Sequence, residues 1–314
     1  MARAYGANAQ LLAAFETTYG TPPVSGFRKM PFVSSTLGSE QGLIASDLLG
    51  YGRDPLAPMR DVIAAGGDIV VPIDLRNFGH WLKLSFGVPI TTEDTGVYTH
   101  EFQSGSYNLP SLSIEIGMPE VPAYFMSAGI RANTLAFNMQ RSGPANATVS
   151  CIAQGETRTA LSAAGAPTEQ ALARFNQFQG EVRRDGQLLG NVTGAELTYS
   201  NNLDRIETLR ADGKIAGADP TIAALTGTLE VRFADTTLID AATNGAASEL
   251  EFSYTIDADN LFKLTAHAVY LPKPKLAVQG PGGVQASFAW QAARDGVLGR
   301  MCTAVLINDV ASYA

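Results

Sequence analysis

The segment from Gly66 to Leu82, which reads GGDIVVPIDLRNFGHWL, brings together several groups that could do chemistry. Its glycines, two carboxylates, arginine and histidine are typical components of a phosphate-binding or catalytic loop. A phosphate loop, however, needs glycine-rich backbone N–H groups at the start of a helix, with a lysine for the phosphates and a hydroxyl for magnesium. Here the glycines precede an apolar run, and the pattern G-x-x-x-x-G-K-[ST] does not occur in the chain. The segment therefore predicts a strand that runs into a helix, not a nucleotide site.

The histidines and cysteines show no metal-binding pattern. His80, His100 and His267 lie in unrelated contexts, and neither H-x-x-x-H nor C-x-x-C occurs. The segment from Asp257 to Asn260 resembles the start of a calcium loop, but Leu261 replaces an oxygen ligand, and the glycine and final glutamate are absent. We therefore expect no metal and no cofactor, and a hairpin turn at Asp257 to Asn260.

Acidic residues are abundant but do not single out a catalytic pair. Thirty Asp and Glu against 22 Lys and Arg give the 314-residue chain a formal charge of −8. Two carboxylates can support glycoside hydrolysis, yet no pair is distinguished by its context, and the G-x-S-x-G pattern of a serine nucleophile is absent. The negative charge argues against a basic groove for nucleic acid. We predict a protein without catalytic activity.

Compartment signals are weak but consistent with one another. Cys151 and Cys302 lie in the apolar segments TVSCIAQ and GRMCTAVLI, which is typical of small core residues in a protein made in a reducing compartment. No segment reaches the roughly 18 uninterrupted apolar residues of a membrane span, and the N-terminus matches a secretory signal poorly. The sequence predicts cytoplasmic synthesis and no membrane association.

The elements that must position any site are mainly β-strands. Short apolar runs alternate with Gly, Asn, Asp and Pro, which favours antiparallel sheets. In Leu229–Phe233 and Glu249–Tyr254, apolar and polar side chains alternate, so each strand has one buried and one solvated face. The predicted strands are Asp68–Ile73, Ser111–Gly117, Asn133–Gln140, Ala147–Gln154, Phe178–Arg183, Gly194–Tyr199, Thr226–Phe233, Glu249–Ile256, Leu264–Leu271, Val284–Ala292 and Thr303–Val310.

Two short helices interrupt the strands. Asp235 is placed to cap the start of one helix, and Asn244-Gly245 form its C-terminal stop. In the segment described first, Asp74 or Asn77 caps a helix that ends at Gly87. Asp74 and Asp235 are therefore predicted to be helix caps.

The same order of elements occurs twice along the chain. Glycine, strand, aspartate and helix follow one another both in Gly67–Leu82 and in Gly227–Ala242. Three further pairs of segments correspond, namely Val33–Gln41 with Tyr199–Glu207, Ser111–Gly117 with Glu249–Thr255, and Val149–Glu156 with Ala286–Asp295. Because the identity is low, chance similarity is the alternative. The predicted organisation is an N-terminal arm at 1–24, a domain at 25–160, a small-residue linker at 161–174 and a second, similar domain at 175–314.

Five stretches resemble the major tail tube proteins of long-tailed bacteriophages, and the resemblance extends from Asn8 to Asp309. They are FETTYGTPP (Phe15–Pro23), LIASDLLGYGRDP (Leu43–Pro55), GGDIVVPIDLRNFGHWL, ELTYSNNLDRIETLRADGKIAGADP (Glu196–Pro220) and GTLEVRFAD. These motifs are patterns of strand, turn and polar loop. The resemblance implies β-sandwich or rolled-sheet domains, each flanked by a short α-helix, in a structural protein of the virion tail. It also implies stacked rings around a channel through which DNA is ejected.

The duplication modifies what the resemblance implies about assembly. Tail tube subunits commonly have one domain, so three chains with two domains each would supply six units. We predict a homotrimeric, pseudo-hexameric ring, with tail terminator and tail-tip proteins at the ends of the tube. DNA would pass transiently and non-specifically, because an acidic lumen repels phosphates.

The resemblance also implies roles for three groups of residues. Candidates for the lumen are Glu115, Glu230, Arg232 and Glu251, with an outer solvent face as the alternative. Candidates for an inter-ring loop are Arg53, Asp54, Pro55, Leu56, Pro58, Arg60 and Asp61, with a solvated surface loop as the alternative. Candidates for N-terminal arm contacts with a neighbouring subunit are Leu11, Leu12, Phe15 and Tyr19.

Two other classes of protein compete with this interpretation. A tail-tip, baseplate or adhesin-type β-domain would bind a receptor or close into one assembly without polymerising. A carbohydrate-active enzyme would present a carboxylate pair in a cleft lined with aromatic residues.

Overall fold

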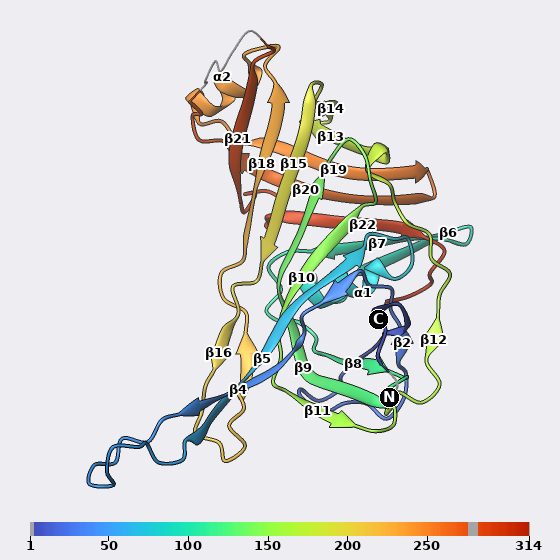
Figure 1. The fold of residues 1–314 in the computed structure, drawn as a ribbon. Helices are drawn as coiled ribbons and strands as arrows, with labels where there is room; N and C mark the ends of the chain where they lie inside the picture. Colours follow the sequence, from blue (N-terminus) through green and yellow to red (C-terminus); the bar gives the residue numbers. More distant parts are fainter. Residues whose placement is uncertain (1–2, 276–281, 314) are drawn as a thin grey trace.

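The computed structural model describes residues 3–275 and 282–313 and consists mainly of β-strands, most of them antiparallel (Figure 1). Within these residues two α-helices occur, α1 (Phe78–Phe86) and α2 (Thr237–Asn244). Two single turns of 3-10 helix, η1 (Gly6–Asn8) and η2 (Gln177–Gln179), precede strands. The prediction of a mainly β fold is confirmed.

A central sheet combines strands from both halves of the chain. Its order is β3 and β4, then β5, β10, β9, β15, β18 and β21, and all neighbours are antiparallel. The strands are β3 (Ser34–Ser35), β4 (Gly38–Ile44), β5 (Met59–Pro72), β10 (Asn146–Ile152), β9 (Ala123–Met139), β15 (Val192–Ser200), β18 (Ala224–Arg232) and β21 (Gln285–Ala293). We call the β9–β15 pairing, which joins the two halves, the intrachain seam.

Each half adds an outer layer of strands. The first contains β1 (Gln10–Phe15), β8 (Leu112–Met118), the beginning of β9 and β11 (Gly155–Thr159), with β2 (Arg28–Lys29) beside β1 and β12 (Thr168–Glu169) beside β2. The second has the order β14 (Gln187–Leu188), β13 (Gly180–Arg184), β19 (Ser248–Asp257), β20 (Asn260–Tyr270) and β22 (Cys302–Asn308). The first half extends this second layer with the hairpin of β7 (Val97–Gln103) and β6 (Ile90–Asp94).

The strand pairings of the two halves correspond one to one. In chain order β1, β4, β5, β8, β9, β10 and β11 take the places of β13, β15, β18, β19, β20, β21 and β22. Each of the six pairings among the first set has its counterpart in the second. Three of the four segment pairs recognised in the sequence lie on equivalent elements. The fourth is displaced, because β3 and β4 correspond to β15, which lies mostly before Tyr199.

One large apolar core serves both halves, and α1 lies inside it. All nine residues of α1 are buried. The ring of Phe78 packs edge-to-face on Phe262 of β20, with centroids 5.1 Å apart, and Phe86 stacks on Tyr199 of β15 at 4.3 Å. The first helix is therefore a core element between the central sheet and the second outer layer, whereas α2 buries only Leu238, Ala241 and Ala242.

A long hairpin leaves the central sheet at the end where β5 begins (Figure 1). Residues 66–72 of β5 pair with β10, whereas residues 59–65 pair with β4 alone. Gly66 and Gly67, with φ of +153° and +141°, lie at this change, and a Cβ on Gly67 would be 2.4 Å from the backbone oxygen of Thr36. We call residues 38–65 the β4–β5 hairpin. The equivalent excursion of the second half, residues 201–223 with β16 (Asp204–Ile206) and β17 (Gly217–Asp219), lies beside it.

None of the helices in the described ranges combines the length and the apolar character that crossing a bilayer requires.

Candidate functional site

The solvent-facing side of the central sheet has a uniform polar character, and we call it the open face. Antiparallel partners lie on the same side of a sheet, so the register defines rows that run across all the strands. One complete row consists of Val70, Thr148, Ala136, Thr198, Thr226 and Gln291. A parallel row consists of Asp68, Ser150, Thr134, Ser200 and Ala224, and further rows contain Asn138, Glu196, Thr228 and Ala289, or Gly194, Glu230 and Ser287.

Sequence alternation explains why this face is polar. Along β18, Leu229 and Val231 are buried, whereas Glu230 and Arg232 are exposed. Along β21, Ala286, Phe288 and Trp290 are buried, and the residues between them are exposed. A period of two places one set in the core and leaves the other outside. The open face is therefore formed mostly by Thr, Ser, Asn, Gln and Ala.

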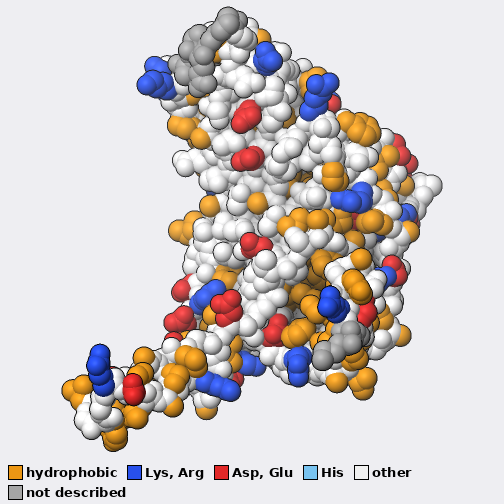
Figure 2. All heavy atoms as spheres, in the orientation of Figure 1, with side chains coloured by type: hydrophobic (Ala, Val, Ile, Leu, Met, Phe, Trp, Pro, Cys, Tyr) orange, Lys and Arg blue, Asp and Glu red, His pale blue; other side chains and the backbone are white. Residues whose placement is uncertain are grey.

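The few charges of the open face are mainly acidic. Where the described parts of β5, β10, β9, β15, β18 and β21 lie side by side, they are Asp68, Glu196 and Glu230, with Arg232 at one margin and Arg131, which pairs with Asp219 at 3.3 Å, at the other. Figure 2 shows a wide white area over the central strands with isolated red groups, and blue side chains mainly around its edges. Glu196 and Glu230 line a shallow hollow of about 380 Å³ beside Gly194.

This chemistry differs from that of surfaces that bind nucleic acid. Proteins bind DNA mainly through Lys and Arg contacts to phosphates, and they bind single strands by stacking bases on aromatic rings. In the rows described above, no aromatic side chain faces solvent, and the central positions carry carboxylates or short neutral groups. Its carboxylates repel phosphates, and Arg131, one of its two cations, is already paired with Asp219.

Two of the four lumen candidates lie on the open face, and two do not. Glu230 and Arg232 lie on β18 as described. Glu251 is on β19 of the second outer layer, where it forms an ion pair with Lys263 at 3.2 Å. Glu115 is fully buried in the first outer layer, where its carboxylate accepts hydrogen bonds from Ser162 Oγ at 2.5 Å and from the Ala163 backbone N–H at 2.7 Å. The assignment of Glu115 to the lumen was therefore wrong, because its charge fastens the linker segment.

The predicted inter-ring loop belongs to the β4–β5 hairpin. Residues 45–62 are mostly exposed, including all the candidates, namely Arg53, Asp54, Pro55, Leu56, Pro58, Arg60 and Asp61. Arg60 and Asp61 are on β5, and the other five lie in the tip between the strands. The hairpin also exposes Leu48, Leu49 and Tyr51, which the sequence analysis did not single out.

The N-terminal residues Leu11, Leu12, Phe15 and Tyr19, predicted from the sequence to contact a neighbouring subunit, pack against their own chain instead. Leu11 and Leu12 lie on β1, which pairs with β8, and their exposed fractions are 0% and 3% within one chain. Phe15 packs against the core, and the Tyr19 ring lies beside the guanidinium of Arg131. The chain buries these residues itself, so no neighbouring subunit is needed to cover them.

A carboxylate that the sequence analysis missed anchors this N-terminal strand. Glu16 accepts hydrogen bonds from the hydroxyls of Ser111 and Ser113, both at 2.6 Å, and from the backbone N–H groups of Gly20 and Gly129, both at 2.8 Å. All four donors come from other turns or strands. Nothing in the sequence around Glu16 indicates these distant partners.

The two predicted cap residues bind backbone at the starts of their helices. Asp74 Oδ2 accepts from the N–H groups of Arg76 and Asn77, at 3.2 and 3.0 Å, just before α1 begins. Burial raises the pKa of Asp74, although these hydrogen bonds oppose the shift. Asp235 Oδ1 accepts from the Thr237 N–H at 2.9 Å, and hydrogen bonding by the Thr237 side chain, followed by that of its backbone, lowers the pKa of Asp235. Each carboxylate lies just outside the helix instead of occupying its N-cap position.

The histidines serve packing and local hydrogen bonds. Burial, together with nearby Arg28 and Lys83, lowers the pKa of His80 to about 3, and its Nε2 has no partner. His100 contacts the Val310 carbonyl oxygen at 2.8 Å, and His267 contacts Thr303 Oγ1 at 2.8 Å. In the part of the chain that the structure describes, no cluster of three or more His, Cys, Asp or Glu side chains could hold a metal ion. Cys151 and Cys302 are buried free thiols, as predicted.

A family model described as phage tail tube protein matches residues 6–292, which include all the strands of the open face except the last residue of β21. The search of curated proteins gives no match to this chain.

Proposed function

The chain belongs to the phage tail tube protein family, as the match over residues 6–292 shows, and from this premise we propose that three copies form a ring and that the rings stack into a DNA conduit. Membership makes the protein a structural component of the virion tail that self-assembles into a tube. The number of chains in each ring, the surface that faces DNA and the contacts between rings are the substance of the proposal.

The observation that carries the trimer is the intrachain seam. Six residue pairs, from Ala195 with Met139 to Ser200 with Thr134, join two topologically equivalent halves into one sheet. The same kind of junction, repeated between chains, would add one chain's central sheet to the next. Six equivalent units then close a ring with three chains. Closing the sheet also removes its edges, which otherwise invite uncontrolled pairing.

The edges of the central sheet support this junction. One edge is formed by β3 and β4, and the other by β21, of which only Gln291, Ala292 and Ala293 pair with β20. Because directions alternate across the sheet, β4 and β21 run the same way. An all-antiparallel junction therefore needs one strand of opposite direction between them. Leu271 and Pro272, which leave β20 beside Ala289 and Trp290, run in that direction.

The open face is then the lining of the channel. It is the face of the central sheet that neither outer layer covers, and it is continuous across the intrachain seam. Its sparse carboxylates and short neutral side chains suit a lining that a polyanion must pass without binding. Glu196, Glu230 and Asp68 are the residues that we assign to DNA repulsion, with Arg232 at the margin.

Native mass spectrometry of rings made from tagged and untagged copies tests the number of chains. A trimer of 33.1 kDa chains has a mass of about 99 kDa, and random mixing gives one more species than there are chains in the ring. We expect four species and threefold symmetry in averaged images. Seven species with sixfold symmetry would refute the trimer, and a chain that stays monomeric at all salt and protein concentrations would refute ring formation.

A further inference from the structure

The two ends of the molecule carry unlike surfaces that have no partner within one chain. At one end, the tip of the β4–β5 hairpin exposes the large apolar residues Leu48, Leu49 and Tyr51, with exposed fractions of 62%, 92% and 66%. A soluble chain rarely presents such a segment unless another surface covers it. Within residues 3–275 and 282–313, nothing buries these three side chains.

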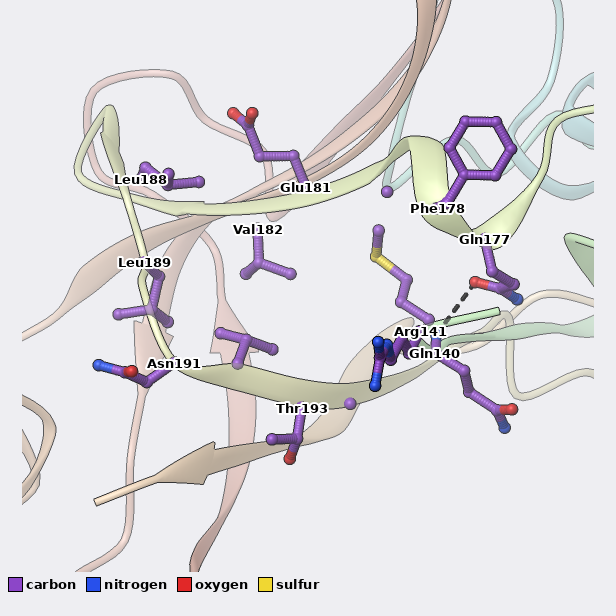
Figure 3. Close-up of a pocket in the computed structure, with 14 residues that line it drawn as sticks. Gln140, Arg141, Gln177, Phe178, Glu181, Val182, Leu188, Leu189, Asn191 and Thr193 are labelled. Atoms are coloured by element: carbon purple, nitrogen blue, oxygen red, sulfur yellow. Dashed lines mark hydrogen bonds between the residues drawn. The ribbon is translucent and has the colours of Figure 1, made fainter. Parts of the chain in front are cut away.

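At the other end, a groove of about 490 Å³ opens between β13–β14 and the start of β15 (Figure 3). In Figure 3 Val182 and Leu189 point into this space, whereas Glu181 points away from it. We call this cavity the β13–β15 groove. Its apolar lining consists of Met139, Phe178, Val182, Leu188, Leu189 and Val192. Phe178 and Leu188, at the rim, are 75% and 63% exposed.

The hairpin tip and the groove lie at opposite ends of the strand direction. Gly66 of β5 is opposite Ile152 of β10, which is opposite Arg131 of β9. From that level the hairpin continues in one direction, while β9 continues in the other direction to Met139 in the groove. Figure 1 shows the same arrangement, with β4 and β14 at opposite ends of the ribbon. Contact between them within one chain is therefore excluded, and contact between stacked copies is head-to-tail.

The charges at the two surfaces are complementary. Among the described residues Arg141, which lines the groove, has neither a hydrogen bond nor an ion pair, whereas Glu181 is already paired with Arg183. On the hairpin tip, Asp47, Arg53 and Asp54 likewise have no partner within the described ranges, so the tip carries two carboxylates and one guanidinium. An unpaired cation beside an apolar groove fits an apolar segment that carries an unpaired carboxylate.

We propose that the β4–β5 hairpin tip of one copy inserts Leu48, Leu49 and Tyr51 into the β13–β15 groove of a second copy of this chain in the adjacent ring. The inference rests on the proposed function, because it presupposes stacked rings. A contact between two different surfaces does not close on itself and continues as a filament. Three such contacts act together in each trimeric ring, so a small loss in one contact is multiplied in the whole junction.

Two complementary variants test the contact. Leu49→Asp places a charge on the hairpin tip and leaves the groove intact, and Leu188→Asp places a charge on the groove rim and leaves the hairpin intact. Both side chains are exposed, so the fold should be kept. Val297→Asp, at a residue that is 94% exposed on another loop, is the matched control. The tubes are quantified by sedimentation and negative-stain microscopy.

We expect each variant alone to form rings and to raise the concentration needed for tubes about tenfold or more, whereas Val297→Asp assembles like the wild type. Mixing the two variants should give double rings without tubes, because one intact hairpin face meets one intact groove face. Tubes from Leu188→Asp at the wild-type concentration, or a mixture that contains only single rings, would overturn the proposal. Failure of the wild-type chain to form rings would instead overturn the proposed function.

A cross-link provides a readout that does not depend on assembly defects. The double variant Leu49→Cys with Leu188→Cys should form disulfides between chains of assembled tubes, and Leu49→Cys with Val297→Cys should not. The native Cys151 and Cys302 are buried and do not compete. Tubes of the first double variant that remain uncross-linked under oxidation, or equal cross-linking in the second, would contradict the assigned contact.

Discussion

Replacing Gly67 by alanine should destabilise the base of the β4–β5 hairpin. The loss should exceed that of the same substitution at a glycine where an added Cβ would meet open space. Gly67 has φ of +141°, a conformation that residues with a Cβ rarely adopt. A Cβ there would lie 2.4 Å from Thr36 O, 2.7 Å from Thr36 C and 2.8 Å from Leu37 N. All three atoms are backbone, so rotation of a side chain cannot relieve the overlap.

The expected loss of unfolding free energy is the sum of two costs and one gain. Backbone strain costs about 1–3 kcal/mol, and forcing atoms into filled space costs a further ~1–3 kcal/mol. The reduced freedom of the unfolded chain returns about 0.4–1 kcal/mol. We therefore expect Gly67→Ala to lower the unfolding free energy by about 3 kcal/mol.

Two control variants separate the costs. Gly50 has φ of +91°, but no atom lies within 4 Å of the place that a Cβ would occupy, so Gly50→Ala should show the strain alone, about 1 kcal/mol. Gly190 has no atom within 4 Å of that place and no positive φ, so Gly190→Ala should be neutral or slightly stabilising.

Denaturant unfolding of unassembled chains, followed by tryptophan fluorescence, measures these differences. Trp81 and Trp290 are 1% and 2% exposed and lie in different halves, so the emission reports on both. If the unfolding free energies of Gly67→Ala and Gly190→Ala differ by less than about 0.5 kcal/mol, the reasoning is refuted, since ordinary surface substitutions change the unfolding free energy by that much.

Three further predictions follow from the site and the core. Burial holds the pKa of His80 at about 3, below its ordinary 6.5, so as the pH falls the imidazole is protonated in the unfolded chain before it is protonated in the folded chain. The contribution of neutral His80 to the unfolding free energy is therefore fully present above pH 6.5 and is lost as the pH falls, by about 3 kcal/mol at pH 4. His80→Phe should remove this part of the slope, and an unchanged slope in urea titrations at several pH values would contradict it. Burial raises the pKa of Cys151 and of Cys302 to about 12, so neither thiol should react with iodoacetamide until the chain unfolds; rapid labelling of the native protein, measured by mass spectrometry, would count against their burial. Converting Glu196 and Glu230 together to Lys should make assembled tubes retain double-stranded DNA at low salt and release it as salt rises, whereas the Gln counterparts should not; equal retention by both, measured by co-sedimentation, would exclude the open face as the lining.

Local patterning was enough to find most elements of the central sheet. Strands such as β18 and β19 alternate apolar and polar residues, and every segment predicted as a strand overlaps one in the structure. The β1 strand was missed because Gln10–Phe15 shows no alternation, and its partner β8 lies about 100 residues further along the chain. The β6 strand, Ile90–Asp94, was missed because it is exposed on both faces, so no burial pattern marks it.

For the candidate site, the sequence predicted which side chains face away from the core but not which surface they face, as Glu230 and Glu251 illustrate. Both alternate with apolar neighbours, and alternation shows that a side chain faces away from the core. It does not show to which layer the strand belongs. β18 joins the central sheet through β15, and β19 joins the outer layer through β13 and β20, so the two glutamates face different surroundings. Glu196 carries the same local signal as Glu230, in the segment Ala195–Tyr199, but only the pairing of β15 with β18 places both on one face, and the seam with β9 makes that face part of the central sheet.

The two halves also differ in the excursions that would take part in stacking, namely the β4–β5 hairpin and residues 201–223. The second-half excursion, residues 201–223, packs beside the base of the β4–β5 hairpin, where the Ile63 N–H donates to the Gly213 carbonyl oxygen. One excursion therefore supports the other, and the β4–β5 hairpin, residues 38–65, is the longer of the two. If three chains form a ring, its lining can approach sixfold symmetry while its rim offers three docking hairpins. Three equivalent hairpin contacts would then join each pair of adjacent rings. The rotation between neighbouring rings should therefore preserve threefold symmetry and be the same along the tube, which averaged images of the tube can measure.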